Sequence, residues 1–320
     1  MAAIAAGVDV GGTKIEVVLI DAAGVVIART RRATPHLITE PAGAATASVI
    51  TEALFELLGD DVSLPVGLGL PGMMTHAGVL AYAPNLPSGN GADFVHLMEA
   101  HRPGQRFVCA NDADCAAVAE HAAGSALGFA DFLMVTLGTG IGGGLFSGGK
   151  LVRGSNGFAG EIGHVVVDPR GPRCPCGNRG CWERFASGAG VARLAREAAI
   201  AGRLPHLVEQ IGDPELIRGE DVTRAAQEGL PEALVVVDEV GWWLALGIAN
   251  MAAILDIGRV VIGGGLTQAA ALLIPAARKH LDGMVEGGEV RPPIEIVAAH
   301  FGEQAGAIGA GFLASQSYPS

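Results

Sequence analysis

Short apolar runs bounded by turn residues predict a series of strands. The first two runs, Ile4–Val10 and Ile15–Ile20, flank a glycine turn, and Val25–Thr30 follows the next turn. Such runs are typical of buried strands, so we expect a β-meander at the N-terminus. Further strands are predicted at residues 66–70, 107–110, 132–137, 145–147, 259–262 and 294–298.

Segments with helical spacing lie between these runs. The longest, Leu230–Leu255, has apolar residues every three or four positions and is predicted to be a buried core helix that packs Trp242 and Trp243. In contrast, Arg203–Arg224 is polar, and we expect irregular structure there, with Asp221 as a helix N-cap. The other predicted helices cover residues 42–58, 113–123, 187–201, 268–281 and 302–314.

The composition suits an α/β protein. A chain of 320 residues is long enough for two lobes of about 150 residues each. Half of the residues are hydrophobic and 48 are glycine, which fits many tight turns around a nucleotide. Met1–Val8 is apolar but lacks a basic start, so we interpret it as part of the first strand.

The charge and the cysteine content indicate which partners and which cellular compartment to expect. A net charge of −12 disfavours a nucleic-acid partner, because phosphate backbones bind Lys- and Arg-rich surfaces. No uninterrupted apolar run reaches membrane-spanning length. Five cysteines, three of them clustered, fit a metal in a reducing compartment better than a disulfide framework. We therefore expect a soluble cytoplasmic protein with neither nucleic acid nor membrane as a partner.

The clustered cysteines lie in a loop from Gly160 to Glu183. One imidazole and three thiolates can close a tetrahedral zinc shell, although free cysteines in a loop are the alternative interpretation. Glu161 and Glu183 flank this set and have no place in the shell. The predicted zinc ligands are His164, Cys174, Cys176 and Cys181.

Two strand–turn–strand segments with glycine turns, residues 11–14 and 138–144, match each other. Glycines let backbone N–H groups approach an anion, so the pair favours a duplicated fold that clamps a nucleotide, although either turn alone is also an ordinary hairpin. Asp9 ends the first strand and could hold Mg²⁺ through water. A third glycine turn, at Gly263–Gly265, could let an adenine or ribose lie flat on the backbone.

Two polar positions are each open to more than one interpretation, and a nearby glycine lies in a turn. Asp112 follows a strand and opens a helix, where a carboxylate can serve as N-cap, as general base or as both. Asn85, in a Pro- and Gly-rich segment, is either a turn-former or a ligand amide. Gly72 belongs to a sharp Pro-Gly turn that exposes backbone at a strand end.

Six motifs together resemble the ROK family of bacterial sugar kinases over essentially the whole chain. They are D-V-G-G-T-K at 9–14, L-P-G at 70–72, N-D-A-D at 111–114, L-G-T-G-I-G-G-G at 137–144, G-E-I-G-H at 160–164 and C-P-C-G-N-R-G-C-W-E at 174–183. The resemblance implies a two-lobed actin/hexokinase-like (ribonuclease H-like) α/β fold with a cleft between the lobes and a zinc-stapled loop. The implied domains are residues 1–112 with 302–320, and residues 113–301.

The resemblance also implies a role for each matching residue. Asp112 would be the catalytic base, and structural zinc would be held by the four ligands above. The implied hexose ligands are Gly72, Asn85, Asn111, Asp112, Glu161, His164 and Glu183. The implied ligands of ATP and Mg²⁺ are Asp9, Gly11, Gly12, Thr13, Lys14, Gly138, Thr139, Gly140, Gly264 and Gly265.

The implied activity is ATP-dependent phosphorylation of the 6-hydroxyl of glucose, in a homodimer or homotetramer. Alternatives within the family are N-acetylglucosamine, N-acetylmannosamine, fructose or mannose as the sugar and polyphosphate as the donor. Alternatives of another class are a non-catalytic sugar-sensing module and an actin/chaperone-type ATPase. Asp114 departs from the family's commoner N-D-A-N, and we expect its carboxylate to point away from the sugar.

Overall fold

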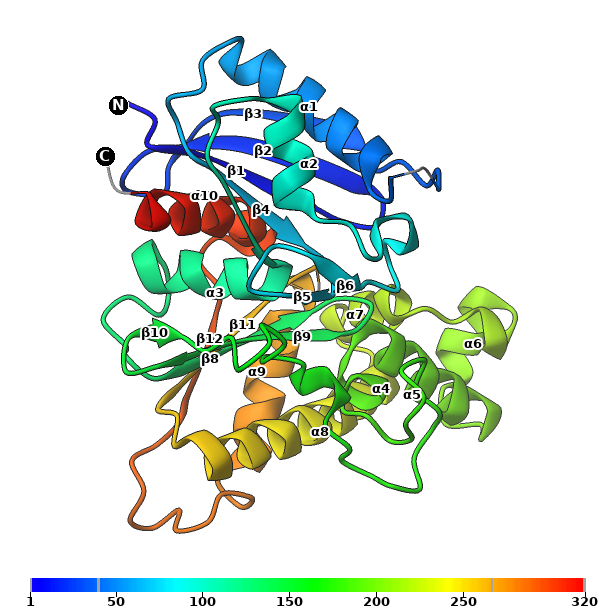
Figure 1. The fold of residues 1–320 in the computed structure, drawn as a ribbon. Coiled ribbons are helices and arrows are strands. Elements are labelled where there is room, and N and C mark those ends of the chain that lie inside the picture. Colours follow the sequence, from blue (N-terminus) through cyan, green and yellow to red (C-terminus); the bar gives the residue numbers. More distant parts are fainter. Residues whose placement is uncertain (1, 39–40, 266, 319–320) are drawn as a thin grey trace. The chain divides into compact units, whose positions relative to one another are not determined.

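The computed structural model describes residues 2–38, 41–265 and 267–318. These residues form two compact units, each with strands and helices (Figure 1). Unit 1 comprises Met1–Ala130, Gly144–Gly160 and Glu303–Ser320, and unit 2 comprises Asp131–Gly143 and Glu161–Gly302. Two five-stranded sheets flanked by helices confirm the predicted mixed α/β class.

The sheet of unit 1 has the strand order β3-β2-β1-β4-β7. Its first three strands are antiparallel and form the predicted meander, while β4 and β7 run parallel to β1. A small hairpin, β5–β6, follows β4 in the chain. The bounds are β1 Ala5–Val10, β2 Lys14–Ile20, β3 Val26–Ala33, β4 Val66–Leu70, β5 Met73–Met74, β6 Leu80–Tyr82 and β7 Phe107–Asn111.

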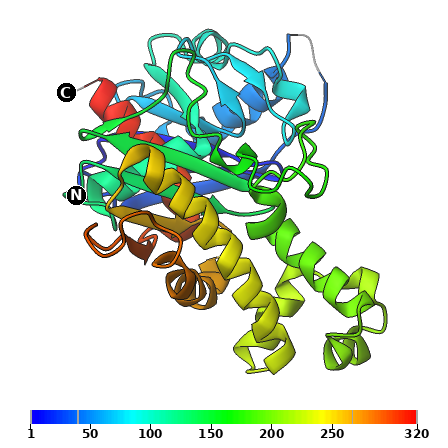
Figure 2. The same cartoon turned by 90° about the horizontal axis from the view of Figure 1, so that it is seen from below.

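Helices cover both faces of this sheet (Figures 1 and 2). Val8 and Leu68 point to one face, where they share a buried core with Ile50 of α1 and Phe94 of α2. Side chains alternate along a strand, so the neighbouring positions face α10 on the other side. The helices are α1 Ala44–Leu58, α2 Phe94–His101, α3 Asp112–Ala123 and α10 Ala305–Ser317, with a short 3-10 turn at Pro87–Gly89.

Glycines allow α10 to lie directly on the strands. A Cβ at Gly7 would stand 1.9 Å from the carbonyl oxygen of Ala307, and one at Gly67 would stand 1.8 Å from that of Ala310. On the opposite side of α10, a Cβ at Gly309 would meet the carbonyl oxygen of Cys115 in α3 at 1.6 Å. The close packing of α10 between α3 and the sheet therefore requires glycine at these positions.

The second sheet has the order β10-β9-β8-β11-β12, and β8, β11 and β12 are parallel. In unit 2, α8 packs along α9, and α7 packs against α5 and α8. The strands are β8 Phe132–Leu137, β9 Ile141–Ser147, β10 Lys150–Leu151, β11 Arg259–Gly263 and β12 Glu295–Ala298. The helices are α4 Glu183–Ala186, α5 Gly188–Ile200, α6 Pro205–Ile211, α7 Gly219–Gln227, α8 Pro231–Leu255 and α9 Thr267–Leu281, with 3-10 turns at Ile162–His164, Pro214–Leu216 and Gly302–Gln304.

Two predictions for the segment Arg203–Arg224 are wrong. The segment Arg203–Arg224 is not irregular, because it holds α6 and most of α7. Asp221 is not an N-cap but the third residue of α7, where its carboxylate accepts from the N–H of Arg218 at 3.0 Å. Both helices are short and bury few apolar residues, so neither stands out in the sequence as an apolar segment.

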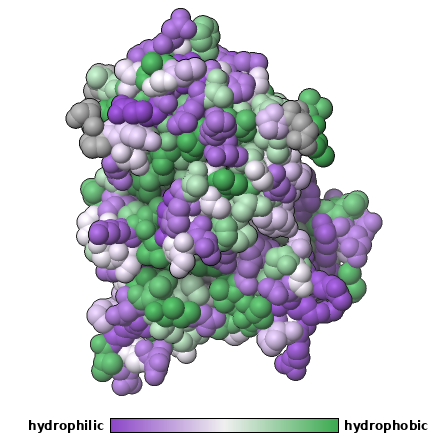
Figure 3. Space-filling model, viewed as in Figure 1, coloured by the Kyte–Doolittle hydropathy of each residue, from purple (hydrophilic) through white to green (hydrophobic). Residues whose placement is uncertain are grey.

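The long helix α8 is a core helix, but one face of it is open. By length and composition it could cross a membrane, yet 56% of its most apolar window is buried inside the protein. Trp243 stacks on Phe185 with ring centroids 4.0 Å apart, as expected for a packed side chain. Trp242 is 39% exposed, so the prediction that it packs in the core is wrong. On the face shown in Figure 3, hydrophilic and hydrophobic side chains are interspersed.

Candidate active site

The first glycine turn joins β1 to β2 in unit 1. The N–H of Gly11 donates to the carbonyl oxygen of Lys14 at 2.8 Å, closing the turn. The carbonyl oxygen of Gly11 accepts from the Thr34 hydroxyl at 2.7 Å, a supporting contact that the sequence did not reveal. A Cβ at Gly12 would lie 3.3 Å from the carbonyl oxygen of Asn85. The structure thus brings the predicted ligand segment around Asn85 against the predicted phosphate turn.

Asp9, at the end of β1, is a partly buried carboxylate near other acids. Burial, with the charges of Asp112 and Glu16, raises its pKa to about 7, against a smaller opposing effect of Lys14. The first turn of α10 is close by, since a Cβ at Gly306 would stand 3.0 Å from the carboxylate. A divalent cation would relieve the repulsion between Asp9 and Asp112, so these side chains fit the predicted Mg²⁺ site.

Asn111, and not Asp112, caps α3, so the N-cap interpretation of Asp112 is wrong. The side-chain oxygen of Asn111 accepts from the N–H groups of Ala113 at 2.8 Å and Asp114 at 3.3 Å. Asp112 is the first residue of the helix, and its carboxylate accepts from the N–H of Ala113 at 2.8 Å. Asp112 therefore stands at the start of α3, with its carboxylate beside the N-terminal N–H groups of the helix.

Gly72 connects β4 to the β5–β6 hairpin and lies beside Asn111. Its φ of +99° is a left-handed conformation, and a Cβ there would stand 2.2 Å from the carbonyl oxygen of Tyr82. Its own carbonyl oxygen accepts from the side-chain amide of Asn111 at 2.9 Å. An amide nitrogen carries two protons, so the second one is left for a hydroxyl ligand.

Lys14 makes an exposed ion pair. Its ammonium lies 3.3 Å from the carboxylate of Glu303, in the turn that precedes α10. An exposed pair of this kind contributes little to stability and is easily exchanged for another anion. The predicted role of Lys14 toward ATP stays a prediction.

The second glycine turn, between β8 and β9, lies against Glu183 in unit 2. The N–H of Gly138 donates to the carbonyl oxygen of Gly140 at 3.0 Å, and Gly138 in turn accepts from the N–H of Gly188 at 2.8 Å. A Cβ at Gly140 would stand 2.5 Å from a carboxylate oxygen of Glu183. The structure therefore places a predicted phosphate-binding turn directly beside a predicted hexose ligand.

The third glycine turn also meets the end of β8. Gly264 has a φ of +90°, and a Cβ there would lie 2.6 Å from the carbonyl oxygen of Leu137. Gly265 is exposed, with open space around its Cβ position. Gly138, Gly264 and Gly265 therefore gather at one strand end in unit 2, as a nucleotide site in an α/β unit requires. The contacts of Thr139 with a ligand stay a prediction.

The predicted zinc ligands form one cluster. The ligand atoms of His164, Cys174, Cys176 and Cys181 all lie within 4.8 Å of one another. The sulfur of Cys174 is 3.7 Å from Nδ1 of His164, and those of Cys176 and Cys181 are 3.5 Å apart. A tetrahedral shell with metal–sulfur bonds of about 2.3 Å needs ligand separations of about 3.8 Å, so this set fits zinc.

His164 presents its two ring nitrogens to different groups. Nδ1 lies on the side of Cys174, while Nε2 is 3.9 Å from the carboxylate of Glu161. Glu183 is 3.8 Å from Nδ1 and accepts from the Cys174 thiol at 3.0 Å. Glu161, 39% exposed, and His164 are thus side by side, with Glu183 next to the cluster. Burial raises the pKa of Glu161.

The loop that carries the cluster is anchored to α8 by Trp182. The indole is fully buried, and its N–H donates to the carbonyl oxygen of Trp243 at 2.8 Å. It lies over Gly247, where a Cβ would stand 1.9 Å from the ring. Ser187 adds a second anchor, since its hydroxyl donates to the carbonyl oxygen of Glu183 at 2.6 Å. These supports fix Glu183 and were not predicted.

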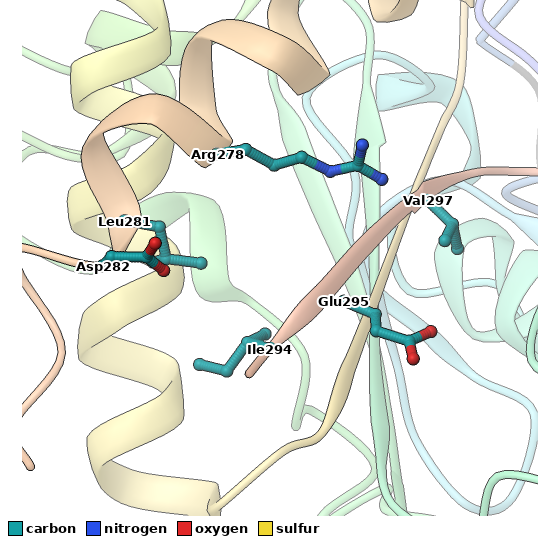
Figure 4. Close-up of a pocket in the computed structure, with 6 residues that line it drawn as sticks. All are labelled: Arg278, Leu281, Asp282, Ile294, Glu295 and Val297. Carbon is teal, nitrogen blue, oxygen red and sulfur yellow. The ribbon is translucent and has the colours of Figure 1, made fainter. Parts of the chain in front are cut away.

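A pocket of about 360 Å³ in unit 2 holds none of the predicted site residues (Figure 4). It lies between α9 and β12. Two of its three charged side chains are already engaged, because Arg278 donates to the carbonyl oxygen of Ile296 and Glu295 pairs with Arg259. We assign no ligand to it. The lining residues are Arg278, Leu281, Asp282, Ile294, Glu295 and Val297.

Several known proteins that are similar to this chain are sugar kinases. The glucokinase of Streptomyces coelicolor is 35% identical over 98% of each chain. The N-acetylmannosamine kinase of Escherichia coli O157:H7 is 32% identical, over 96% of this chain and 97% of the relative. The crystal structure of a ROK family glucokinase from Streptomyces griseus, in complex with glucose and AMPPNP, is 35% identical with a TM-score of 0.83, over 98% of this chain and 99% of that chain.

The family model of the ROK family matches residues 5–317. This range includes all three glycine turns, the candidate base and the Cys/His cluster. The resemblance noted from the six motifs is thereby confirmed, and the chain belongs to the ROK family.

Proposed function

We propose that the protein is an ATP-dependent hexose kinase that phosphorylates the 6-hydroxyl of glucose. The observation that carries the proposal is the contact between Gly140 and Glu183, because it joins a phosphate-binding turn to a hexose ligand beside the Cys/His cluster. The glucokinase relatives at 32–35% identity support the same reaction class.

In the proposed reaction, Asp112 accepts the proton of the primary hydroxyl while that oxygen attacks the γ-phosphorus in line. The helix dipole at the start of α3 favours the carboxylate form. The backbone N–H groups of the turns at Gly11–Thr13 and Gly138–Gly140 would stabilise charge on the phosphates. Asp9 would hold the Mg²⁺ that accompanies ATP, and this cation would neutralise charge on the transferred group.

Hexose recognition is assigned to carboxylates and amides. A carboxylate can accept from two vicinal hydroxyls at once, which suits Glu161 and Glu183. His164 would bind zinc through Nδ1 and leave Nε2 for a hydroxyl, consistent with the position of Nε2 on the side of Glu161. Zinc would supply no chemistry to the reaction and would fix the loop that bears these three ligands.

The donor nucleotide is assigned to the remaining glycines. Gly264 and Gly265 present backbone without side chains, which would let adenosine lie against them. Lys14 and Thr139 complete the proposed set at the two turns. We further propose that residues 1–112 with 302–320, and 113–301, are the functional domains, and that the protein acts as a homodimer or homotetramer.

A coupled assay of ADP release across a panel of hexoses tests the proposal. We expect the highest kcat/KM for glucose and a product phosphorylated at O6, identified by phosphorus NMR. If only 2-acetamido sugars are phosphorylated, the proposed substrate would change from glucose to an N-acetylhexosamine, as in the N-acetylmannosamine kinase relative. Binding of sugar without any turnover would favour the sugar-sensing alternative.

The role of Asp112 is tested by Asp112→Asn. Loss of a positioned base lowers rates by about 10²–10⁴-fold. We expect kcat to fall in that range while glucose binding, measured by calorimetry, stays within about threefold. An unchanged kcat would remove Asp112 from the mechanism.

A further inference from the structure

Asp114 is a buried carboxylate in the first turn of the helix that begins with the candidate base. It is 1% exposed, and its Oδ2 lies 3.9 Å from Nε of Arg153. Arg153 is itself largely buried, with a side chain 19% exposed. Burying a carboxylate is costly unless a positive charge compensates it, and the guanidinium of Arg153 supplies such a charge.

Arg153 also contacts the β5–β6 hairpin. Its Nη2 donates to the carbonyl oxygen of Thr75 at 3.5 Å, a long hydrogen bond at the end of β5. Thr75 closes the hairpin turn, since its hydroxyl accepts from the N–H of Val79 at 3.1 Å. The guanidinium therefore lies between α3 and this turn.

The loop from Arg153 to Gly160 is fitted closely to the same turn. The carbonyl oxygen of Gly154 lies 2.9 Å from Nε2 of His76. Gly157 has a φ of +93°, and a Cβ there would stand 2.4 Å from the carbonyl oxygen of Met74. The N–H of Ala159 returns to the carbonyl oxygen of Arg153 at 3.2 Å. Glu161 directly follows Gly160, the last residue of this loop.

The first turn of α3 is thus connected to both ends of β5. Asn111 donates directly to Gly72, which precedes β5, and Asp114 reaches Thr75, which follows β5, through Arg153. The two methionines of β5 lie between these connections. A shift of the hairpin relative to Asp112 would move Gly72, a proposed hexose ligand, away from the base.

We propose that Asp114 and Arg153 are positioning residues of the hexose site. Their ion pair sets the β5–β6 hairpin and the 153–160 loop relative to the first turn of α3, and so determines hexose affinity. This inference rests on the proposed function, because it assigns the hairpin to the sugar. It also gives the second carboxylate of N-D-A-D a purpose other than contact with substrate.

The test combines Asp114→Asn, Arg153→Met and the double variant. We expect each single change to raise KM for the hexose by about fivefold or more, with a smaller change in kcat. Arg153→Met leaves a buried carboxylate without its cation, so the double variant should bind hexose better than Arg153→Met alone. Additive effects on KM would overturn the proposal.

The matched control is Arg102→Gln. Arg102 is a buried arginine of the same unit, and it donates to the carbonyl oxygens of Gly59 and Asp61, in the turn that follows α1. Its loss should lower the melting temperature without changing KM. Equal KM values in the control and in Asp114→Asn, with equal losses of stability, would show that the ion pair is only structural.

Hydrogen exchange separates this proposal from the proposed function. Amides of residues 75–79 and 153–160 should exchange faster in Asp114→Asn than in wild type, and not in Arg102→Gln. If wild type phosphorylates no hexose, the proposed function fails while exchange still tests the connection. If wild type is active and Asp114→Asn changes neither KM nor exchange, only the positioning role fails.

Discussion

The side-chain amide of Asn111 donates to the carbonyl oxygen of Gly72 at 2.9 Å, while its side-chain oxygen caps α3. One residue therefore fixes both the start of the helix that bears Asp112 and the turn before β5. This double use makes Asn111 a structural residue as well as a proposed hexose ligand.

Replacing Asn111 by Ala should remove the cap and the bond to Gly72 together. We expect a loss of about 1–2 kcal/mol in the free energy of unfolding, measured with urea, and a fall in kcat/KM for the hexose. Asp93→Ala is the control, because Asp93 caps α2 by accepting from His96. It should lose similar stability with unchanged kinetics, and equal kinetic losses in both variants would contradict the assignment.

Gly140→Ala should displace the carboxylate of Glu183. The added Cβ would stand 2.5 Å from that carboxylate, and the flexible end of the side chain can move away. We expect KM for the hexose to rise about tenfold, as measured by steady-state kinetics. Gly258→Ala is the control, since nothing lies within 4 Å of its Cβ position. A normal KM in Gly140→Ala would separate Glu183 from hexose binding.

The stability of the nucleotide-free protein should depend on pH through Asp9. The pKa of Asp9 is about 7 in the folded protein and 3.8 in the unfolded chain, so folding takes up a proton at pH values between these two pKa values. The unfolding free energy of wild type should therefore decrease as the pH rises from about 4 to about 7, by up to about 4 kcal/mol. Asp9→Asn should lose this dependence in urea titrations at pH 5 and pH 8. Parallel pH profiles for the two proteins would refute the shifted pKa.

The Cys/His cluster should hold one zinc ion per chain. Cys176→Ser should lower the zinc content, reduce the melting temperature and weaken hexose binding, because the loop would lose its scaffold. Cys109→Ala serves as the control, since Cys109 lies in the core of unit 1 and outside the cluster. If metal analysis finds no zinc in folded and active wild-type protein, the assignment of these residues as zinc ligands is wrong.

Much of the fold could be predicted from the apolar runs in the sequence. The predicted strands at 66–70 and 132–137 agree with β4 and β8 residue for residue. Both are buried nearly throughout, so their sequences are continuous apolar segments between turn residues. The His–Cys₃ set was equally clear, because few other roles bring three cysteines and one histidine into a short loop.

Two kinds of feature could not be predicted: the choice between two neighbouring residues for one role, and contacts between residues far apart in the sequence. Asn111 and Asp112 are both good cap residues, and only the backbone shows that Asn111 occupies the capping position. Thr34 supports the phosphate turn from 23 residues away, and Arg153 reaches Asp114 across the fold. Periodicity carries no information about such contacts, since they arise from packing of elements that are separate in the chain.

The close fit of α10 on the first sheet also has a consequence for biosynthesis. Gly7 and Gly67 are made before residues 161–302 of unit 2, but the helix that covers them is made after those residues. One face of the first sheet therefore stays uncovered on the ribosome while the rest of the chain emerges at about 5–20 residues per second. Unit 1 completes its fold only when α10 has left the exit tunnel, so until then the face of the sheet that α10 covers must be kept from associating with other proteins.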